Sequence, residues 1–257
     1  MPRIISGCPM LESLALYYCG VFQFLDLRKS LSLTRLEIKH CSWASRPTKI
    51  IAPHIHYLRL KTSETCKLVD VSSLSEAYLD IGIYERFNRK ADLLLATVLK
   101  MLAKLRNVER LTVSTTVLQI LSAAEIRRFP FRALRVQTLI VKTQLARSLI
   151  TGIAWLLQNS PDLKRLIVQT TDKGSMWVDE CVDSYLDTQG SKLDKLWRLK
   201  YGAFPPSREM YSMLHSEDST WKLLASFIEC LLRNTKTLET LVIWLGAFHN
   251  ESHDWAK

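Results

Sequence analysis

The alternation of apolar and polar residues is most regular between residues 144 and 168. Six apolar side chains recur there at helical spacing and form one stripe: Leu145, Leu149, Ile150, Ile153, Leu156 and Leu157. Pro161 ends this helix, because it has no N–H to donate and disfavours helical geometry in the residue before it. Leu163, Leu166 and Val168 then alternate inward as in a short strand. The pattern predicts a helix over 144–159 followed by a strand.

This helix–strand unit recurs along the chain. Shifted by 75 residues, LLQNSPDLKRLIV at 156–168 aligns with LLRNTKTLETLVI at 231–243. Apolar triplets of the form Leu-x-x-Leu-x-Leu predict eight strands: Leu11/Leu14/Leu16, Leu33/Leu36/Ile38, Ile55/Leu58/Leu60, Leu74/Ala77/Leu79, Val108/Leu111/Val113, Val136/Leu139/Val141, Leu163/Leu166/Val168 and Leu238/Leu241/Ile243. Internal repetition on this scale indicates a solenoid.

The spacing of the triplets predicts the type of solenoid. Their first members are 22, 22, 19, 34, 28, 27 and 75 residues apart, and the early values are typical of leucine-rich repeats. Further helices are expected at 90–105, 116–128 and 219–234, the last with Asp218 or Ser219 as its N-cap. A helix between strands requires a parallel crossover. We predict an α/β leucine-rich-repeat solenoid with a curved parallel sheet and helices on its convex side.

The chain is expected to fall into two parts. Residues 1–88 carry short repeats, and residues 89–257 carry longer repeats that contain helices. An insertion at about 169–218 has no strand triplet and is locally acidic up to Asp187. Such long loops are either functional or partly disordered, so we expect this one to project from the solenoid and to be cut first by a protease.

Composition excludes several classes of protein. The chain has 257 residues, of which 47% are hydrophobic and 23% charged, so it is not disordered by composition. Its six cysteines show no CxxC pair, which favours reduced, mostly buried thiols. The N-terminus has no signal-peptide pattern, and the most hydrophobic run, 93–105, is too short to span a bilayer. We expect an intracellular protein, cytoplasmic or nuclear, with no membrane contact.

No catalytic or metal-binding pattern is found. His54 and His56 have no third ligand nearby in sequence, and His249 and His253 flank a Glu that stands at neither position used by zinc peptidases. No GxGxxG, P-loop or GxSxG sequence occurs. The protein is therefore not expected to be an enzyme or to hold a cofactor.

The residues between the members of each triplet should face the concave surface of the sheet. They include seven basic and three acidic side chains, interleaved with three Tyr and one Trp. Aromatic residues and Arg are favoured at binding hot spots. The candidate protein-binding residues are Tyr17, Arg35, Lys39, Tyr57, Arg59, Lys61, Tyr78, Arg110, Lys142, Arg165 and Trp244.

The net charge of +10 leaves a second function open. It permits binding of nucleic acid or another polyanion through a basic concave surface. No block of five or six basic residues and no recognition motif supports this alternative, so an unknown protein target is favoured and nucleic acid is not. A truncated remnant without function is a third possibility.

Several segments resemble one known family. CPMLESLAL, LTRLEIKHC, the run from APHIHYLRLK to EAYLDI, and FIECLLRNTKTLETLVI are similar to plant F-box/leucine-rich-repeat proteins, including those with a C-terminal FBD region. The resemblance implies repeats that capture a target for a cullin-based ubiquitin ligase, whose adaptor binds an N-terminal F-box. Here only seven residues precede Cys8, so we expect no F-box and no adaptor binding by this chain alone. The FBD likeness is partial, because no clear additional strand precedes 219–234.

Overall fold

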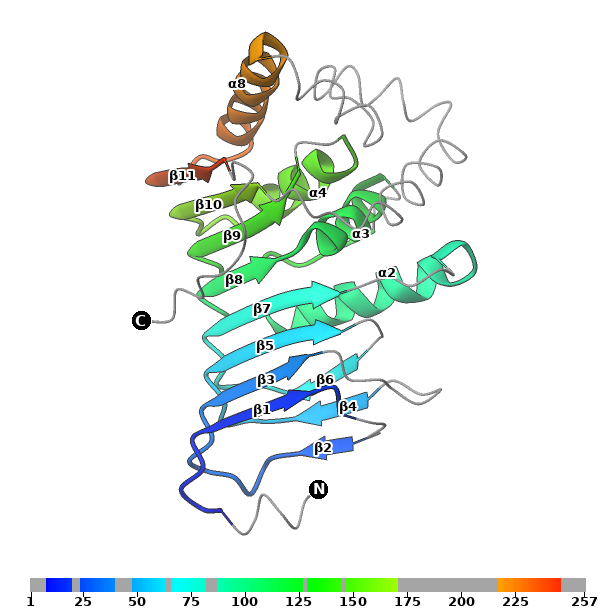
Figure 1. Ribbon diagram of the computed structural model, residues 1–257, viewed down its shortest axis with the longest axis vertical. Coiled ribbons are helices and arrows are strands. Elements are labelled where there is room, and N and C mark those ends of the chain that lie inside the picture. The colour runs from blue at the N-terminus through cyan, green and yellow to red at the C-terminus, as the bar shows by residue number, and fades with distance from the viewer. Residues whose placement is uncertain are drawn as a thin grey trace.

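A computed structural model of the chain describes residues 8–19, 24–39, 48–62, 66–81, 87–126, 129–144, 147–170 and 217–245. Its main feature is an eight-stranded parallel sheet whose strands follow one another in sequence order (Figure 1). The strands are β1 (Ser13–Tyr17), β3 (Arg35–Lys39), β5 (Tyr57–Thr62), β7 (Glu76–Ile81), β8 (Arg110–Val113), β9 (Thr138–Thr143), β10 (Arg165–Thr170) and β11 (Thr240–Trp244). The eight predicted strands and the leucine-rich-repeat fold are confirmed.

The register of the sheet stacks the middle members of the triplets in one continuous row. This row consists of Leu14, Leu36, Leu58, Ala77, Leu111, Leu139, Leu166 and Leu241. Its six interior members are fully buried, whereas Leu14 and Leu241 at the two ends are half-buried. Each interior repeat is therefore covered by two neighbours and each end repeat by one, as expected for a solenoid.

A ladder of turns holds the repeats in phase. At the start of each main-sheet strand after β1, two consecutive backbone N–H groups donate to a single carbonyl of the preceding repeat. The accepting carbonyls belong to Glu12, Thr34, His56, Ser75, Glu109, Gln137 and Lys164. The last pair of donors, Glu239 and Thr240, bonds to Lys164, so β11 continues the same ladder directly after β10. Strand β10 extends to Thr170, two residues into the predicted insertion, and residues 171–216 lie outside the described part of the chain.

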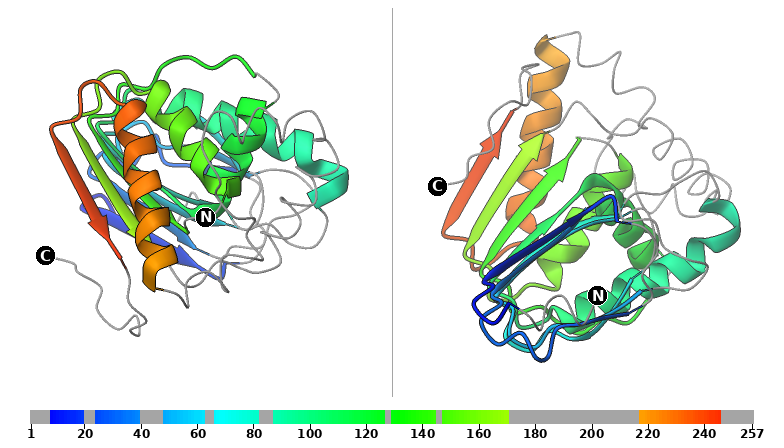
Figure 2. Two further views of the ribbon diagram at one scale, coloured as in Figure 1. Left: turned by 90° about the horizontal axis from the view of Figure 1, so that it is seen from above. Right: turned by 60° about the horizontal axis from the view of Figure 1, so that its bottom comes forward.

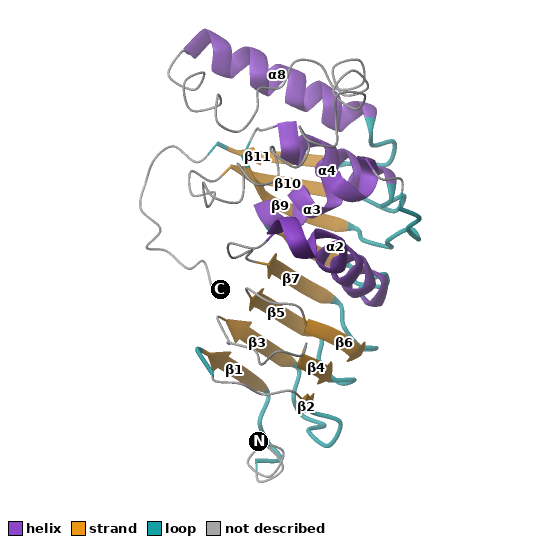
Figure 3. Ribbon diagram, turned by 90° about the vertical axis from the view of Figure 1, so that its right-hand side faces the viewer, coloured by secondary structure: helices purple, strands orange, loops and turns teal. Residues whose placement is uncertain are grey.

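The N-terminal repeats return through a second parallel sheet that the triplet pattern did not predict. It consists of β2 (Phe24–Asp26), β4 (Thr48–Ile51) and β6 (Cys66–Asp70), and it lies on the same side of the main sheet as the helices (Figure 3). Strand β2 buries Leu25, β4 buries Ile50, and β6 buries Cys66 and Leu68. A repeat of about 22 residues leaves too little chain for a typical helix, which averages about 11–12 residues, plus its connections.

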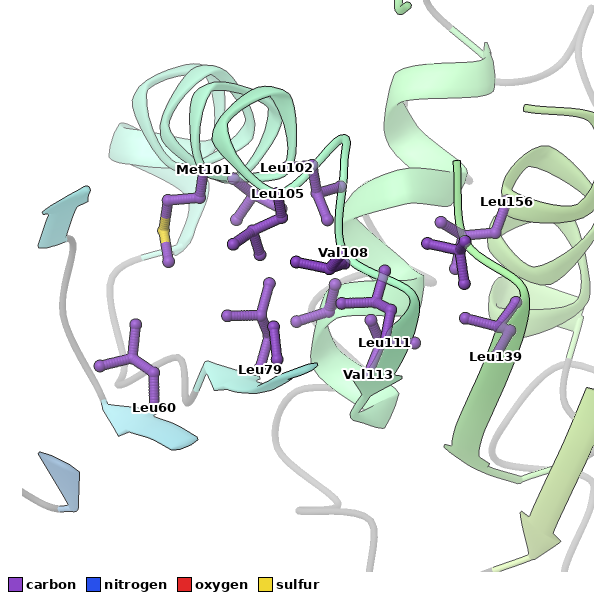
Figure 4. Packing of buried hydrophobic residues seen from close by; sticks show 14 of the residues in the cluster. Leu60, Leu79, Met101, Leu102, Leu105, Val108, Leu111, Val113, Leu139 and Leu156 are labelled. Carbon is purple, nitrogen blue, oxygen red and sulfur yellow. The ribbon is translucent and has the colours of Figure 1, made fainter. Parts of the chain in front are cut away.

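The longer repeats return through helices. These are α2 (Phe87–Lys104), α3 (Thr115–Ile126), α4 (Arg147–Gln158) and α8 (Glu217–Arg233), within a few residues of the predicted ranges. The predicted N-cap of α8 is wrong, because the helix begins at Glu217 and includes Asp218 and Ser219. All four helices cover one face of the sheet (Figure 2). Met101, Leu102 and Leu105 of α2 point toward Leu79 and Val108 in the buried layer between them (Figure 4).

The sequence echo at 75 residues has a structural counterpart at the helix ends. Asn159 and Asn234 each donate a side-chain N–H to the carbonyl four residues earlier, Trp155 O at 2.8 Å and Cys230 O at 2.7 Å. Both bonds add a side-chain donor to a carbonyl in the last turn of a helix, and Trp155 O also accepts the backbone N–H of Asn159 at 3.1 Å. The repeated Asn is therefore a cap that ends the helix at the same point of the repeat.

Helices α3 and α4 pack against each other at unusually close range. Gly152 lies so near α3 that an added Cβ would stand 2.0 Å from the Leu118 carbonyl oxygen. The Gly152 N–H donates to Ser122 Oγ at 2.8 Å, and this hydroxyl donates to Leu118 O at 3.1 Å. Glycine is required here because the contact is between backbones.

The cysteines of the described ranges are free thiols in mixed surroundings. Cys66 and Cys230 are buried, Cys19 is half-buried, and Cys8 is exposed. The prediction of mostly buried thiols is therefore wrong for Cys8, which precedes β1 and is exposed. Burial raises the pKa of the Cys66 thiol to about 12, so this cysteine is a packing residue and not a reactive one. Cys41 and Cys181 lie outside the described residues.

Candidate protein-binding face

The residues between the triplet members form three parallel rows on the face opposite the helices, which we call the open face. The first row is Ser13, Arg35, Tyr57, Glu76, Arg110, Thr138, Arg165 and Thr240. The second is Ala15, Glu37, Arg59, Tyr78, Thr112, Ile140, Ile167 and Val242. The third holds Tyr17, Lys39, Lys61 and Asp80 on β1 to β7, and Lys142, Gln169 and Trp244 on β9 to β11. All eleven predicted binding residues belong to these rows.

The first group on the open face, which we call the Glu37 cluster, surrounds a carboxylate that is only 9% exposed. Tyr17 Oη donates to Glu37 Oε2 at 3.1 Å, and Arg35 Nη2 donates to Oε1 at 3.0 Å. Lys39 Nζ lies 3.3 Å from Oε2. Burial acts to raise the pKa of Glu37, but the hydrogen bonds from Arg35, Lys39 and Tyr17 outweigh it and lower the pKa below its ordinary value. Glu37 is therefore ionised. Arg35 and Lys39 of β3 balance its charge, and Tyr17 of β1 donates a further hydrogen bond to it.

Cations lie over the tyrosine rings of the same face. The Arg35 guanidinium is 3.9 Å from the centre of the Tyr57 ring, and Lys39 Nζ is 4.6 Å from that of Tyr17. Both distances are within cation–π range, so each ring holds a long side chain in a defined position. Burial raises the pKa of Tyr57, and this tyrosine therefore stays neutral at physiological pH. The result is a rigid amphipathic surface of the kind that binding hot spots use.

Two more cations have carboxylate partners on the neighbouring strand. Lys61 Nζ lies 3.4 Å from Asp80 Oδ2, and Arg110 Nε lies 3.8 Å from Glu76 Oε2. The positive charge that the sequence suggested for this face is therefore largely compensated over β3 to β8. Sequence reasoning did not include Glu37, Glu76 or Asp80 in the site. Their position at i±2 or directly across from the basic residues was the available signal, because such residues share one face of a sheet.

The open face becomes apolar toward the C-terminus. Its middle row continues as Ile140, Ile167 and Val242, all half-exposed, and ends beside Trp244, which is 63% exposed. The predicted residues Arg165 and Trp244 thus lie on strands well beyond the tyrosines of β1, β5 and β7 (Figure 1). The structure brings the predicted residues onto one face but distributes them over several groups.

Other kinds of site find no support in the described residues. No group of three or more His, Cys, Asp or Glu there could hold a metal ion. An open depression of about 800 Å³ at the strand-entry edge is lined by side chains of both signs, including Glu109, Arg135 and Lys164, and it offers no apolar enclosure for a small molecule. No helix of the described part is long and apolar enough to cross a bilayer.

The stacked strand triplets, the ladder of turns and the helix-covered face define a leucine-rich-repeat solenoid, and the described residues leave the other face of its sheet uncovered. Known proteins specify the class further, although no family model and no solved structure matches the chain. The Arabidopsis thaliana F-box protein At1g60180 is 44% identical over 251 residues, which cover 97% of this chain and 76% of that protein. The chain therefore belongs to the plant F-box/LRR-repeat family.

Other relatives from the same plant agree. The F-box/LRR-repeat protein At5g02930 is 46% identical over 256 residues, or 95% of this chain and 53% of its own length. The F-box/LRR-repeat protein At3g28410 is 48% identical over 252 residues, or 97% of this chain and 53% of its own length. The chain thus spans about half the length of these two curated relatives.

Proposed function

We propose that this chain is a protein-interaction module that binds a target protein on its open face, like the target-recognition part of an F-box ubiquitin-ligase subunit. The observation that carries the proposal is the group of rigid aromatic and cationic residues on the open face: Tyr17, Arg35, Lys39 and Tyr57. No helix or strand of the described part of the chain covers this group. A preformed surface loses little entropy on binding, and this favours a protein partner.

We assign no adaptor contact to these repeats. The relatives are named F-box proteins. In our proposal the adaptor is bound through an F-box, whereas the described strands and helices bind the target. We also propose an intracellular protein without catalysis or cofactor. The division into residues 1–88 and 89–257, with a partial FBD-like region at the end, is likewise a proposal. It agrees with the change from strand to helix returns near residue 87.

Nucleic-acid binding is the alternative that we do not favour. A polyanion needs a row of free cations, and each phosphate that a cation neutralises steepens the salt dependence of binding. Here Arg35, Lys39, Lys61 and Arg110 each have a carboxylate partner on the open face. Those carboxylates would repel a phosphate chain laid along the sheet.

Site-specific photo-crosslinking tests the proposal. A photoreactive phenylalanine in place of Tyr57, on β5 of the open face, should capture a defined set of proteins in a plant extract. The same group in place of Lys100, which is exposed on α2, should not capture that set. Replacing Arg35, Tyr57 and Arg59 together by Ala should remove these proteins from an affinity preparation, and circular dichroism should show that the variant is still folded. Equal capture from positions 57 and 100 would refute the proposal.

A further inference from the structure

A second group, which we call the Tyr78 cluster, lies at the centre of the open face and consists of Arg59, Tyr78 and Lys142. The Arg59 guanidinium is 4.8 Å from the centre of the Tyr78 ring, and Lys142 Nζ is 5.4 Å from it. Lys142 comes from β9 and reaches across β8, where the intervening Thr112 is short and buried. Two cations from strands on either side thus converge on one aromatic ring.

The Tyr78 cluster differs from its neighbours in charge. Glu37 is directly across from Arg59 in the sheet register, but its carboxylate binds Arg35, Lys39 and Tyr17 instead. Within the described ranges Arg59 has no ion pair, and its Nε is buried without a hydrogen-bond acceptor. A buried donor of this kind is costly until an acceptor fills the site, more so in a charged group.

Tyr78 adds a neutral hydrogen-bond donor to the cluster. Burial raises the pKa of Tyr78 to about 12, with the nearby Asp80 acting in the same direction, so the hydroxyl keeps its proton at any physiological pH. The planar guanidinium of Arg59, 4.8 Å from the centre of the Tyr78 ring, carries a fork of N–H groups that matches the two oxygens of a carboxylate.

We propose that the Tyr78 cluster is the subsite of the open face that receives a carboxylate, from an aspartate or glutamate in an extended segment of the target protein. The inference rests on the proposed function and names the chemistry of its partner. A polynucleotide fits less well, because Glu37, Glu76 and Asp80 border the cluster in the register and would repel neighbouring phosphates. An isolated acidic side chain with neutral or basic neighbours matches a single cationic site surrounded by carboxylates.

A labelled peptide with a single glutamate among glycine and serine residues tests this assignment by fluorescence anisotropy, and the same peptide with glutamine in place of the glutamate is the comparison probe. The full chain should bind the glutamate peptide and bind the glutamine peptide at least tenfold more weakly. Arg59→Gln should weaken binding of the glutamate peptide by about tenfold or more, as expected for loss of a charge-assisted hydrogen bond. The affinity of the Arg59→Lys variant should lie between those of the wild type and of Arg59→Gln, because lysine keeps the positive charge but lacks the planar pair of N–H groups.

The matched control is Lys67→Gln, which removes the same charge from an exposed position of β6 on the second sheet. It should change the affinity less than twofold. If Lys67→Gln and Arg59→Gln weaken binding equally, only the net charge matters and the subsite is refuted. Inorganic phosphate or a single-stranded oligonucleotide that competes better than the glutamate peptide, in an Arg59-dependent way, would also overturn the carboxylate assignment. Circular dichroism confirms that each variant is folded.

The outcome is separable from that of the proposed function. Proteins cross-linked at position 57 with no glutamate-peptide binding, or with binding that Arg59→Gln leaves unchanged, would preserve the interaction module and refute this subsite. Absence of any cross-link specific to the open face would refute the function itself.

Discussion

The two halves of the main sheet share one strand pattern but differ in how the chain returns and in what the open face displays. Strands β1 to β7 return mostly through the short strands β2, β4 and β6, whereas β8 to β11 are joined by α3, α4 and α8. The apolar triplet determines where a strand of the main sheet forms. The number of residues in the repeat determines whether the chain returns to the next strand through a short strand or through a helix. About 22 residues allow a short strand, whereas the 27 or 28 residues between later triplets allow α3 and α4, each of 12 residues.

The same division separates two chemistries on the open face. The N-terminal half carries Tyr17, Tyr57 and Tyr78 with their cations, while the C-terminal half continues the middle row with Ile140 and Ile167. One inward pattern therefore supports two different outward surfaces, because the residues between triplet members do not contribute to the core. The outward surface can therefore vary along the sheet without any change of fold.

The largest expected effect tests whether the two halves share one core. Leu166→Ala should lower the free energy of unfolding by about 2–5 kcal/mol, because the side chain is fully buried and the substitution leaves a cavity. Leu36→Ala, at the same position of the row in the N-terminal half, should cost a similar amount. Leu241→Ala should cost less, because Leu241 is half-buried at the end of the row. Urea unfolding followed by circular dichroism measures all three.

An equal loss for Leu241→Ala and Leu166→Ala would contradict the ordering. It would mean that a repeat beyond β11 covers Leu241 as fully as β9 and β11 cover Leu166.

The second effect concerns the close contact between α3 and α4 in the helical half. Gly152→Ala should lower the free energy of unfolding by about 1–3 kcal/mol, because the new Cβ would meet the Leu118 carbonyl and force α3 and α4 apart. Helix propensity alone predicts the opposite sign, since Ala is favoured over Gly inside a helix by about 1 kcal/mol. Thermal unfolding of the variant decides between them, and a stabilised Gly152→Ala protein would contradict the close packing.

The third effect belongs to the N-terminal half and depends on pH. Glu37→Gln should cost about 1–2 kcal/mol at pH 7, because it removes the charge that Arg35 and Lys39 neutralise and weakens their hydrogen bonds. The pKa of Glu37 is lowered in the folded protein. Its contribution is therefore fully present above the unfolded pKa of about 4.3, and it is lost as the pH falls through the lower folded pKa.

Urea unfolding of wild type and Glu37→Gln between neutral and strongly acidic pH tests this expectation. The difference between the two proteins should shrink below the unfolded pKa. A difference that stays constant over this range would show that the carboxylate charge is not what Glu37 contributes.

Sequence alone predicts the strands, the helices and the direction of each face, because apolar periodicity records burial. Leu14, Leu36 and Leu58 were expected in one row and the register confirms it. The second sheet could not be predicted this way, since β2, β4 and β6 are short strands that bury Leu25, Ile50, and Cys66 with Leu68, and these residues do not form a triplet. The pattern also placed Gly152 inside a helix without showing its neighbour, because close approach of two backbones leaves no periodic trace.

The open face was predictable as a set of residues but not as a set of contacts. Alternation places Arg35, Glu37 and Lys39 on one side of β3, and this is confirmed. Which cation Glu37 binds depends on rotamers and on the register with β1 and β5, which sequence does not specify. The same choice determines that Arg59 stays without a carboxylate partner within the described residues. The charge balance of the site therefore follows only from the structure.

The smallest expected effect lies at the boundary between the two halves. Arg110 of β8 pairs with Glu76 of β7 at 3.8 Å, and both side chains are about half-exposed, 48% and 40%. Exposed ion pairs contribute about 0–1 kcal/mol, because solvent screens the attraction and two long side chains lose freedom. Arg110→Gln should therefore change the free energy of unfolding by less than about 0.5 kcal/mol, well below the cost of Glu37→Gln. Thermal unfolding at low and high salt measures it, and a loss as large as that of Glu37→Gln would show that the β7–β8 boundary depends on charge as strongly as the Glu37 cluster does.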